Sequence, residues 1–287
     1  MPRYARPTTP DEAIARLAEG TWTVLSGGTD FYPAQGARPI RDDILDIGGV
    51  DALRGIGEDG GDVVIGAATT WADIVRARLP GGFDALRQAA REVGSIQVQN
   101  AGTIAGNLCN ASPAADGVPA LMVLDAEVEL ASLRGTRRLP LSAFLLGNRR
   151  TARQPDELVT AIRVPAASSG GRSGFVKLGA RRYLVISIAM AAVRVETDAA
   201  GRIARCAVAV GACSAVARRL QRLEADLVGH PADAAALAVI GERHFGGLSP
   251  IDDVRASAAY RMQAAREIVV RALSCVLGGA ADRGVAA

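Results

Sequence analysis

The 287-residue sequence contains few of the side chains that usually bind metals. It has four cysteines and two histidines. The cysteines, at positions 109, 206, 213 and 275, form no CxxC pair and are far from the spacing of zinc or iron–sulfur sites. We therefore expect free thiols and no metal in this chain.

Long apolar runs and a strong charge of one sign are also absent. No run approaches the roughly 18 residues that a membrane helix needs, and the first residues, MPRYARPTTPDEA, lack the apolar centre of a signal peptide. The net charge is only +3, and the arginine pairs lie far apart without aromatic residues between them. These features predict a cytoplasmic protein without a membrane span and argue against binding to nucleic acid.

Lysine is almost missing. All but one of the 33 lysine and arginine residues are arginine, and the exception is Lys177. One interpretation is codon bias with a chance survivor. The other is that this position needs a compact ammonium group, where a planar guanidinium would not fit. Composition alone favours the first.

Two segments rich in small residues are the most informative part of the sequence. They read SGGTD at 26–30 and TIAGNLCNASPAAD at 103–116. Glycine lets the main chain approach a ligand, and Ser, Thr and Asn add short hydrogen-bonding groups. Glycine clusters more often mark ordinary turns, and neither segment matches GxGxxG or GxxxxGK[ST]. Together, however, they suggest one phosphate-rich cofactor held from both sides.

The length and the 49% of hydrophobic residues predict a sizeable core and about two domains. Capping residues and apolar spacing predict helices at 10–19, 70–75, 85–93 and 112–124. The first would have Thr9 as its N-cap, and the second would begin with a capping box of Thr70 and Asp73. In the last of these, Ser112 and Pro113 would be the N-cap and first helical residue, and the free amides would face the second glycine segment.

Strands and helices mix without regular alternation. The strands that we predict lie at 24–25, 44–47, 53–56, 63–65, 127–131, 158–164, 175–178, 187–196 and 203–210. The Gly60–Gly61 pair predicts that 53–56 and 63–65 form a hairpin. Residues 166–174, AASSGGRSG, form the best candidate linker. The remainder, from 214 onward, reads as helices.

The sequence resembles a known family over essentially its full length. The matching segments are SGGTDFYP, QNAGTIAGNLCNASPAADGVPALMVLDAEVEL, DELVTAIRVP and KLGARR. They resemble the FAD-carrying medium subunit of molybdenum hydroxylases, a family that includes aerobic carbon monoxide dehydrogenases, xanthine dehydrogenases and nicotine and quinoline dehydrogenases.

The resemblance implies an α+β fold. It consists of the two-part FAD-binding module of vanillyl-alcohol oxidase and para-cresol methylhydroxylase, followed by a smaller domain with a three-stranded antiparallel sheet and helices. The expected domains are 1–168, with subdomains of about 1–55 and 56–168, and 169–287.

The resemblance also implies the cofactor-binding residues. Both glycine segments would wrap the FAD pyrophosphate, Asp116 would contact the sugar chain of FAD, and Val159 and Lys177 would lie beside the cofactor, with Lys177 near the isoalloxazine. The residues of the two glycine segments that match the family pattern are Val24, Leu25, Ser26, Gly27, Gly28, Thr29, Asp30, Phe31, Thr103, Ile104, Ala105, Gly106 and Asn107. No catalytic residue is expected, because the flavin performs the redox chemistry.

The implied function is that of an oxidoreductase subunit. A separate molybdopterin-binding large subunit would hydroxylate the substrate, and a small subunit with [2Fe-2S] clusters would carry the electrons. The flavin would pass these electrons to an external acceptor. Two alternatives remain open: a self-sufficient FAD oxidoreductase of the same fold, and a scaffold without flavin.

Some residues depart from the family pattern. Ala105 replaces the first glycine of TIGGN, so this position should have a negative φ, or the segment should be slightly displaced. Gln99 stands where many relatives have arginine. Tyr183 and Ile186 could shield the flavin, although a core position would explain Ile186 equally well.

Overall fold

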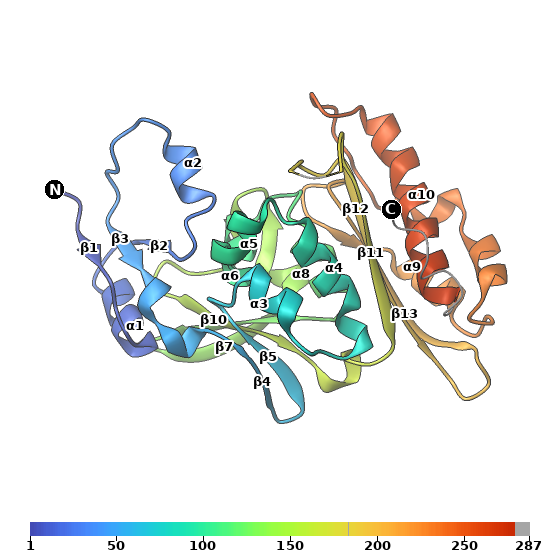
Figure 1. Ribbon diagram of the computed structural model, residues 1–287, viewed down its shortest axis with the longest axis horizontal. Coiled ribbons are helices and arrows are strands. Elements are labelled where there is room, and N and C mark those ends of the chain that lie inside the picture. Colours follow the sequence, from blue (N-terminus) through green and yellow to red (C-terminus); the bar gives the residue numbers. More distant parts are fainter. Residues whose placement is uncertain (183, 279–287) are drawn as a thin grey trace. The chain divides into compact units, whose positions relative to one another are not determined.

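The computed structural model describes residues 1–182 and 184–278, which form two compact units (Figure 1). Unit 1 consists of residues 1–77, 94–112 and 126–165, and unit 2 of residues 78–93, 113–125 and those from 166 onward. Unit 2 is thus assembled from three separate stretches of sequence.

Unit 1 begins with a small parallel sheet in the order β1 (Tyr4–Ala5), β3 (Ile44–Asp46), β2 (Thr23–Leu25). The helix α1 (Pro10–Ala18) buries Ala13, Ile14 and Leu17 in the same core as Leu45 of β3. It begins as predicted: the Thr9 hydroxyl accepts the N–H of Glu12.

A second sheet of unit 1 is antiparallel and has the order β4-β5-β10-β6-β7. Its strands are β4 (Ile56–Asp59), β5 (Asp62–Gly66), β10 (Leu158–Val164), β6 (Glu127–Ser132) and β7 (Gly135–Pro140). The predicted hairpin of the first two is confirmed, although β4 begins three residues later than predicted because 51–53 form a 3-10 turn. The central strand, β10, is buried along most of its length.

The remaining elements of unit 1 are short. They are α2 (Phe31–Gln35), α3 (Trp71–Arg76), α5 (Ile96–Ala101), α6 (Ile104–Asn110), α8 (Leu141–Phe144) and the pair β8 (Leu145–Gly147) and β9 (Arg150–Thr151). The capping box predicted at the start of α3 is present: Thr70 and Asp73 bond each other's N–H groups reciprocally.

Unit 2 contains an antiparallel sheet with helices on both sides (Figure 1). Its strands, in sheet order, are β11 (Arg172–Leu178), β12 (Ala189–Thr197), β13 (Ile203–Gly211) and β14 (Arg218–Arg219). The helices are α4 (Asp84–Glu92), α7 (Gly117–Met122), α9 (Gln221–Leu227) and α10 (Ala258–Leu277). The first seven residues of β12 are all buried, as expected for a strand covered on both faces.

Three local predictions were wrong, and one segment has a structure that we had not predicted. The sheet of unit 2 has a fourth, two-residue strand, β14. Residues 172–174 of the predicted linker belong to β11. The second glycine segment is largely helical, because Thr103 caps α6 by accepting the N–H of Gly106. The helix predicted from Ser112 begins only at Gly117, since the Pro113 carbonyl accepts the N–H of Ala212 in the sheet.

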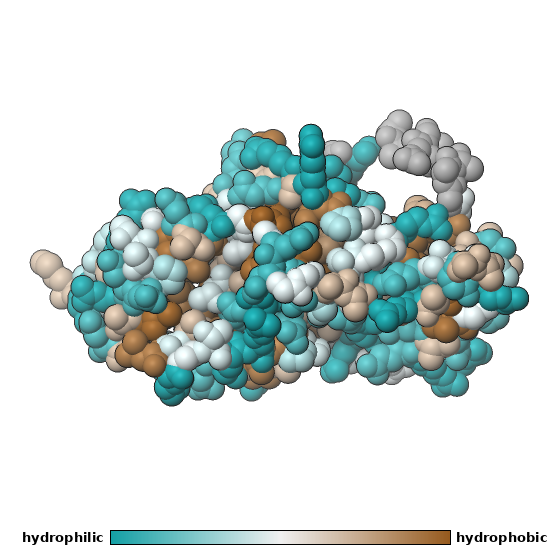
Figure 2. Space-filling model, turned by 90° about the horizontal axis from the view of Figure 1, so that it is seen from below, coloured by the Kyte–Doolittle hydropathy of each residue, from teal (hydrophilic) through white to brown (hydrophobic). Residues whose placement is uncertain are grey.

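The surface drawn in Figure 2 is largely hydrophilic, with small brown apolar areas interrupted by polar side chains. Among the described residues, no helix combines the length and the hydrophobicity that crossing a bilayer requires.

Candidate functional site

The first glycine segment forms a turn at the end of a strand in unit 1. Val24 and Leu25 end β2, and Phe31 begins α2. Gly28 has a φ of +68°, which favours glycine over residues with a side chain. Within the described residues, the N–H groups from Gly27 to Thr29 have no protein acceptor. The turn therefore offers consecutive donors to a ligand, as anion-binding turns do.

This turn packs directly against the segment that leads into the second glycine motif. A Cβ on Gly27 would lie only 1.9 Å from the carbonyl oxygen of Ala101, so this position admits no side chain. The Thr29 hydroxyl lies 3.3 Å from where a Cβ on Gly102 would be. The structure thus brings together the two segments that the sequence singled out.

The second segment presents its residues from the start of α6. Thr103 is the N-cap, and Ile104, Ala105, Gly106 and Asn107 follow in the helix. Ala105 is helical, which confirms the expectation of a negative φ. The side-chain oxygen of Asn107 is buried and has no hydrogen-bond partner among the described residues. Since buried polar atoms are normally paired, this acceptor fits a position completed by a ligand donor.

Val159, the remaining predicted contact in unit 1, lies in β10. Its side chain is buried, and it pairs with Leu130 of β6 immediately before a register shift in the ladder. The strand β10 contacts α6. A core position therefore accounts for Val159 as well as a cofactor contact does.

In unit 2, Lys177 and Asp116 form a buried ion pair. The Lys177 Nζ lies 2.6 Å from Asp116 Oδ2 and also donates to the main-chain carbonyl of Glu92 at 3.1 Å. The second carboxylate oxygen of Asp116 accepts the hydroxyl of Ser187 at 2.7 Å. Both charged side chains are less than a tenth exposed.

Burial dominates the electrostatics of Asp116. It raises the pKa of the carboxyl group, while Lys177 and then Ser187 act in the opposite direction. The compact ammonium fits between a carboxylate and a carbonyl, which is the kind of position that the isolated lysine suggested. Removal of either charge would leave the other buried without a counter-charge.

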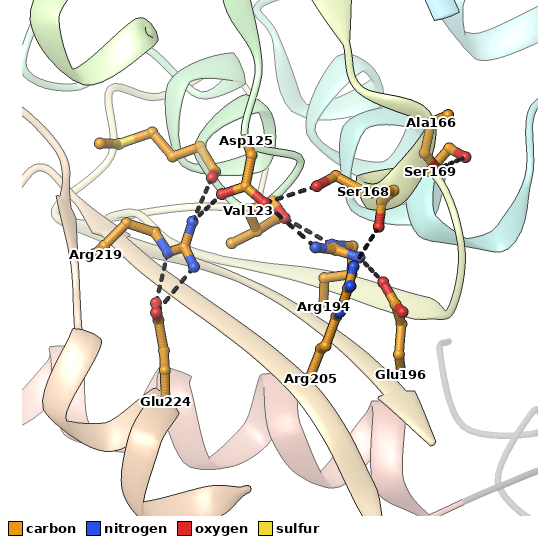
Figure 3. Close-up of polar contacts among 12 residues, drawn as sticks. Val123, Asp125, Ala166, Ser168, Ser169, Arg194, Glu196, Arg205, Arg219 and Glu224 are labelled. Carbon is orange, nitrogen blue, oxygen red and sulfur yellow. Dashed lines mark hydrogen bonds and ion pairs between the residues drawn. The ribbon is translucent and has the colours of Figure 1, made fainter. Parts of the chain in front are cut away.

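The far end of α7, which follows Asp116, is fixed by two arginines of the sheet (Figure 3). Arg194 donates to the Val123 carbonyl at 2.7 Å, and Arg219 donates to the Met122 carbonyl at 2.9 Å. Both arginines also pair with Asp125. These bonds satisfy carbonyls at the C-terminus of the helix, which would otherwise lack partners.

Sequence reasoning missed Ser187 and the Glu92 carbonyl as partners of this pair. Ser187 was assigned to a strand, whereas it is fully buried just before β12. No local motif marks it, because its partner is 71 positions away. Ile186 is 63% exposed, so the core interpretation was wrong; Tyr183 lies outside the described residues.

The cysteines and histidines make no second site. All four cysteines are free, and burial raises the pKa of Cys206 to about 12 and that of Cys213 to about 11, so both are protonated at neutral pH. His244 is buried and bonded to the Gly241 N–H and to Asp226. Within the described part of the chain, no cluster of His, Cys, Asp or Glu could hold a metal ion.

Two family models match the chain. Residues 1–167 match the FAD binding domain in molybdopterin dehydrogenase, and residues 175–276 match the CO dehydrogenase flavoprotein C-terminal domain. The chain is 30% identical over 271 residues to the 6-hydroxypseudooxynicotine dehydrogenase complex subunit alpha of Paenarthrobacter nicotinovorans, covering 93% of this chain and 91% of that protein.

The chain is likewise 30% identical over 279 residues to the carbon monoxide dehydrogenase medium chain of Hydrogenophaga pseudoflava. This match covers 94% of this chain and 95% of that protein. The solved structure of that organism's carbon monoxide dehydrogenase lacking the Mo-pyranopterin moiety matches with a TM-score of 0.86 and 29% identity, covering 96% and 97% of the two chains. These matches include both parts of the chain. The protein therefore belongs to the family of FAD-binding medium subunits of molybdenum hydroxylases, which are oxidoreductases.

Proposed function

We propose that this subunit receives electrons from [2Fe-2S] clusters of a partner and passes them through its FAD to an external acceptor. The observation that carries the proposal is the packing of Gly27 against Ala101, with the N–H groups from Gly27 to Thr29 left free. When bound, FAD supplies the redox chemistry, and the protein supplies binding and electrostatics.

The chain's own residues divide this work. The free amides of the first segment would hold the FAD pyrophosphate, because N–H donors bind phosphate oxygens well. Asn107 has a free carbonyl oxygen for a donor group of the cofactor. The proposed contacts are Val24, Leu25, Ser26, Gly27, Gly28, Thr29, Asp30, Phe31, Thr103, Ile104, Ala105, Gly106, Asn107, Asp116, Val159 and Lys177.

Lys177 retains one donor for this role. An ammonium group has three N–H donors, and two of them reach Asp116 and the Glu92 carbonyl. The third would hold an acceptor atom of the isoalloxazine. Because Asp116 neutralises most of the charge, Lys177 would favour the reduced flavin less than an unpaired lysine would.

The partners follow from the named relatives. These are a "complex subunit alpha" and a "medium chain", and the matching solved structure is of an enzyme form that lacks the Mo-pyranopterin moiety of the molybdenum cofactor. We assign the molybdopterin to a large partner subunit and the clusters to a small one. The free thiols agree with a reducing, cytoplasmic compartment.

The test is purification of the tagged chain from its native host, followed by cofactor analysis. We expect FAD in a 1:1 ratio to the chain, together with a molybdenum subunit and an iron–sulfur subunit. Recovery of the chain alone, with FAD and its own turnover of a substrate, would favour the self-sufficient oxidoreductase. A purified chain that has no flavin absorbance but still co-purifies with partner subunits would favour the scaffold without flavin.

A further inference from the structure

The segment that carries Ser187 is held by residues outside the proposed FAD contacts. Ser187 and Ile188 lie where the chain, after the loop that follows β11, enters β12. The Ser187 hydroxyl donates to Asp116. A serine hydroxyl can rotate toward many acceptors, so the position of its main chain decides whether it reaches this carboxylate.

Two arginines from the C-terminal region hold consecutive carbonyls of this segment. Arg255 donates to the Ser187 carbonyl at 3.0 Å, and Arg261 of α10 donates to the Ile188 carbonyl at 2.5 Å. Arg261 also reaches the carbonyl of Ala212 at 3.2 Å. The main chain on both sides of the Ser187–Ile188 peptide is therefore fixed.

One carboxylate orients both guanidinium groups. Asp253 Oδ2 accepts from Arg255 at 2.6 Å, and Asp253 Oδ1 accepts from Arg261 at 2.7 Å. Asp253 also accepts the main-chain N–H of Arg255 at 2.8 Å. Guanidinium forks are suited to such planar, multiple contacts. We name the trio of Asp253, Arg255 and Arg261 the arginine brace.

Burial of the charged side chain of Arg261 costs free energy. Its side chain is 1% exposed, and a buried charge is tolerated only with a close counter-charge and several hydrogen bonds. The contacts with Asp253 and with two carbonyls supply these, while the Nε of Arg261 has no hydrogen-bond partner among the described residues. Arg255 is different, since its side chain is 30% exposed. If it is removed, a water molecule can replace the guanidinium as the donor to the Ser187 carbonyl.

We propose that Arg255 and Arg261, oriented by Asp253, are positioning residues that hold Ser187 so that its hydroxyl bonds Asp116. The inference rests on the proposed function, in which Asp116 and Lys177 contact FAD. The brace touches neither of these side chains in the contacts described, and it acts through the main chain of residues 187 and 188.

The brace affects the flavin through the charge of Asp116. Burial favours the neutral carboxylic acid by raising the pKa of Asp116, and Lys177 and, after it, the Ser187 hydroxyl counteract this effect. If Ser187 shifts, Asp116 binds a proton more readily and the ammonium of Lys177 loses part of its counter-charge. A less neutralised ammonium beside the flavin raises the midpoint potential.

The test compares Arg255→Gln, Ser187→Ala and the double variant in the purified full-length protein. We expect each single variant to weaken FAD binding by about tenfold and to raise the flavin midpoint potential. The double variant should resemble Ser187→Ala alone, because both changes remove the same link. Arg255→Lys, which keeps a charged donor, should recover part of the affinity.

The matched control is Arg266→Gln, which removes a similar arginine–carboxylate pair, with Glu242, from the same helix as Arg261. It should leave both FAD affinity and potential at the wild-type values. Unchanged affinity and potential in Arg255→Gln, or fully additive losses in the double variant, would overturn the inference. If the wild-type protein bound no FAD, the proposed function itself would fail, so the two failures are distinguishable.

Discussion

Lys177 shows how one side chain can be singled out by composition and explained only by the fold. Its rarity and the family resemblance both predicted a special position. The structure adds that its partner is Asp116, which is 61 positions away, at 2.6 Å. The two residues were predicted separately as cofactor contacts, because no periodicity in a sequence pairs residues at such a distance. Because the two charges are paired and buried, substitution of either residue should lower the stability of the protein.

The first prediction concerns this pair. Lys177→Met should lower the free energy of unfolding by about 3–5 kcal/mol, because it leaves a buried carboxylate without its counter-charge. The double variant Lys177→Met with Asp116→Asn should recover most of this loss. Urea unfolding of the wild type, of Lys177→Met, of Asp116→Asn and of the double variant would measure the coupling. Equal stability of Lys177→Met and the wild type would show that the pair is not buried in solution.

The second prediction concerns Gly27. Gly27→Ala should weaken FAD binding at least tenfold, or about 1.4 kcal/mol, because its methyl group would collide with the Ala101 carbonyl and separate the two segments. Gly57→Ala is the matched control in the same unit, since a Cβ there has no neighbour within 4 Å. Fluorescence titration with FAD gives both affinities. A Gly27→Ala protein that binds like the wild type would exclude this turn from the site.

At the scale of elements, signals that depend on neighbouring residues were reliable. The caps of α1 and α3, the hairpin of β4 and β5, and the three long strands of unit 2 were all predicted from local patterns. Predictions failed where the structure depends on hydrogen bonds between residues far apart in the sequence. Ser112 and Pro113 look like a helix start, yet the Pro113 carbonyl bonds Ala212 of the sheet. Gly106 and Asn107 are poor helix formers, yet α6 includes them.

The third prediction concerns the edge strand β7. Arg137 of this strand makes two hydrogen bonds, at 2.6 and 2.8 Å, to Glu157 just before β10. This pairing, stronger than the effect of burial, lowers the pKa of Glu157. A lowered folded-state pKa means that the stabilisation is present above the unfolded value, about 4.3, and is lost as the pH falls through the folded value.

Glu157→Gln should therefore cost about 1.5–3 kcal/mol at pH 7, and the difference from the wild type should shrink below about pH 4. Denaturant unfolding at several pH values would measure this. The exposed Glu242, which also pairs with an arginine, is the control, and Glu242→Gln should change stability by less than about 0.5 kcal/mol. A difference for Glu157→Gln that is constant with pH would argue against the ion pair.

At the scale of the whole molecule, the family resemblance predicted the fold class and the FAD-binding domain. The α+β fold and the FAD-binding domain were confirmed. The domain boundary at 168 remains a prediction, as do the individual FAD contacts. Composition and spacing cannot reveal that residues 78–93 and 113–125 pack with the C-terminal part, because only long-range contacts assign them there.

This interleaving has a consequence for synthesis on the ribosome. The helix α4 buries Ala85, Leu86, Ala89 and Ala90, and it packs on β11, which ends at Leu178. The helix α7 also contacts α4 and follows it closely in the sequence, but about eighty residues must be synthesised after α4 before β11 can cover its share of this face. Such distant contacts slow folding and expose apolar surface meanwhile. A nascent chain that stalls between these two elements is an expected substrate for chaperones.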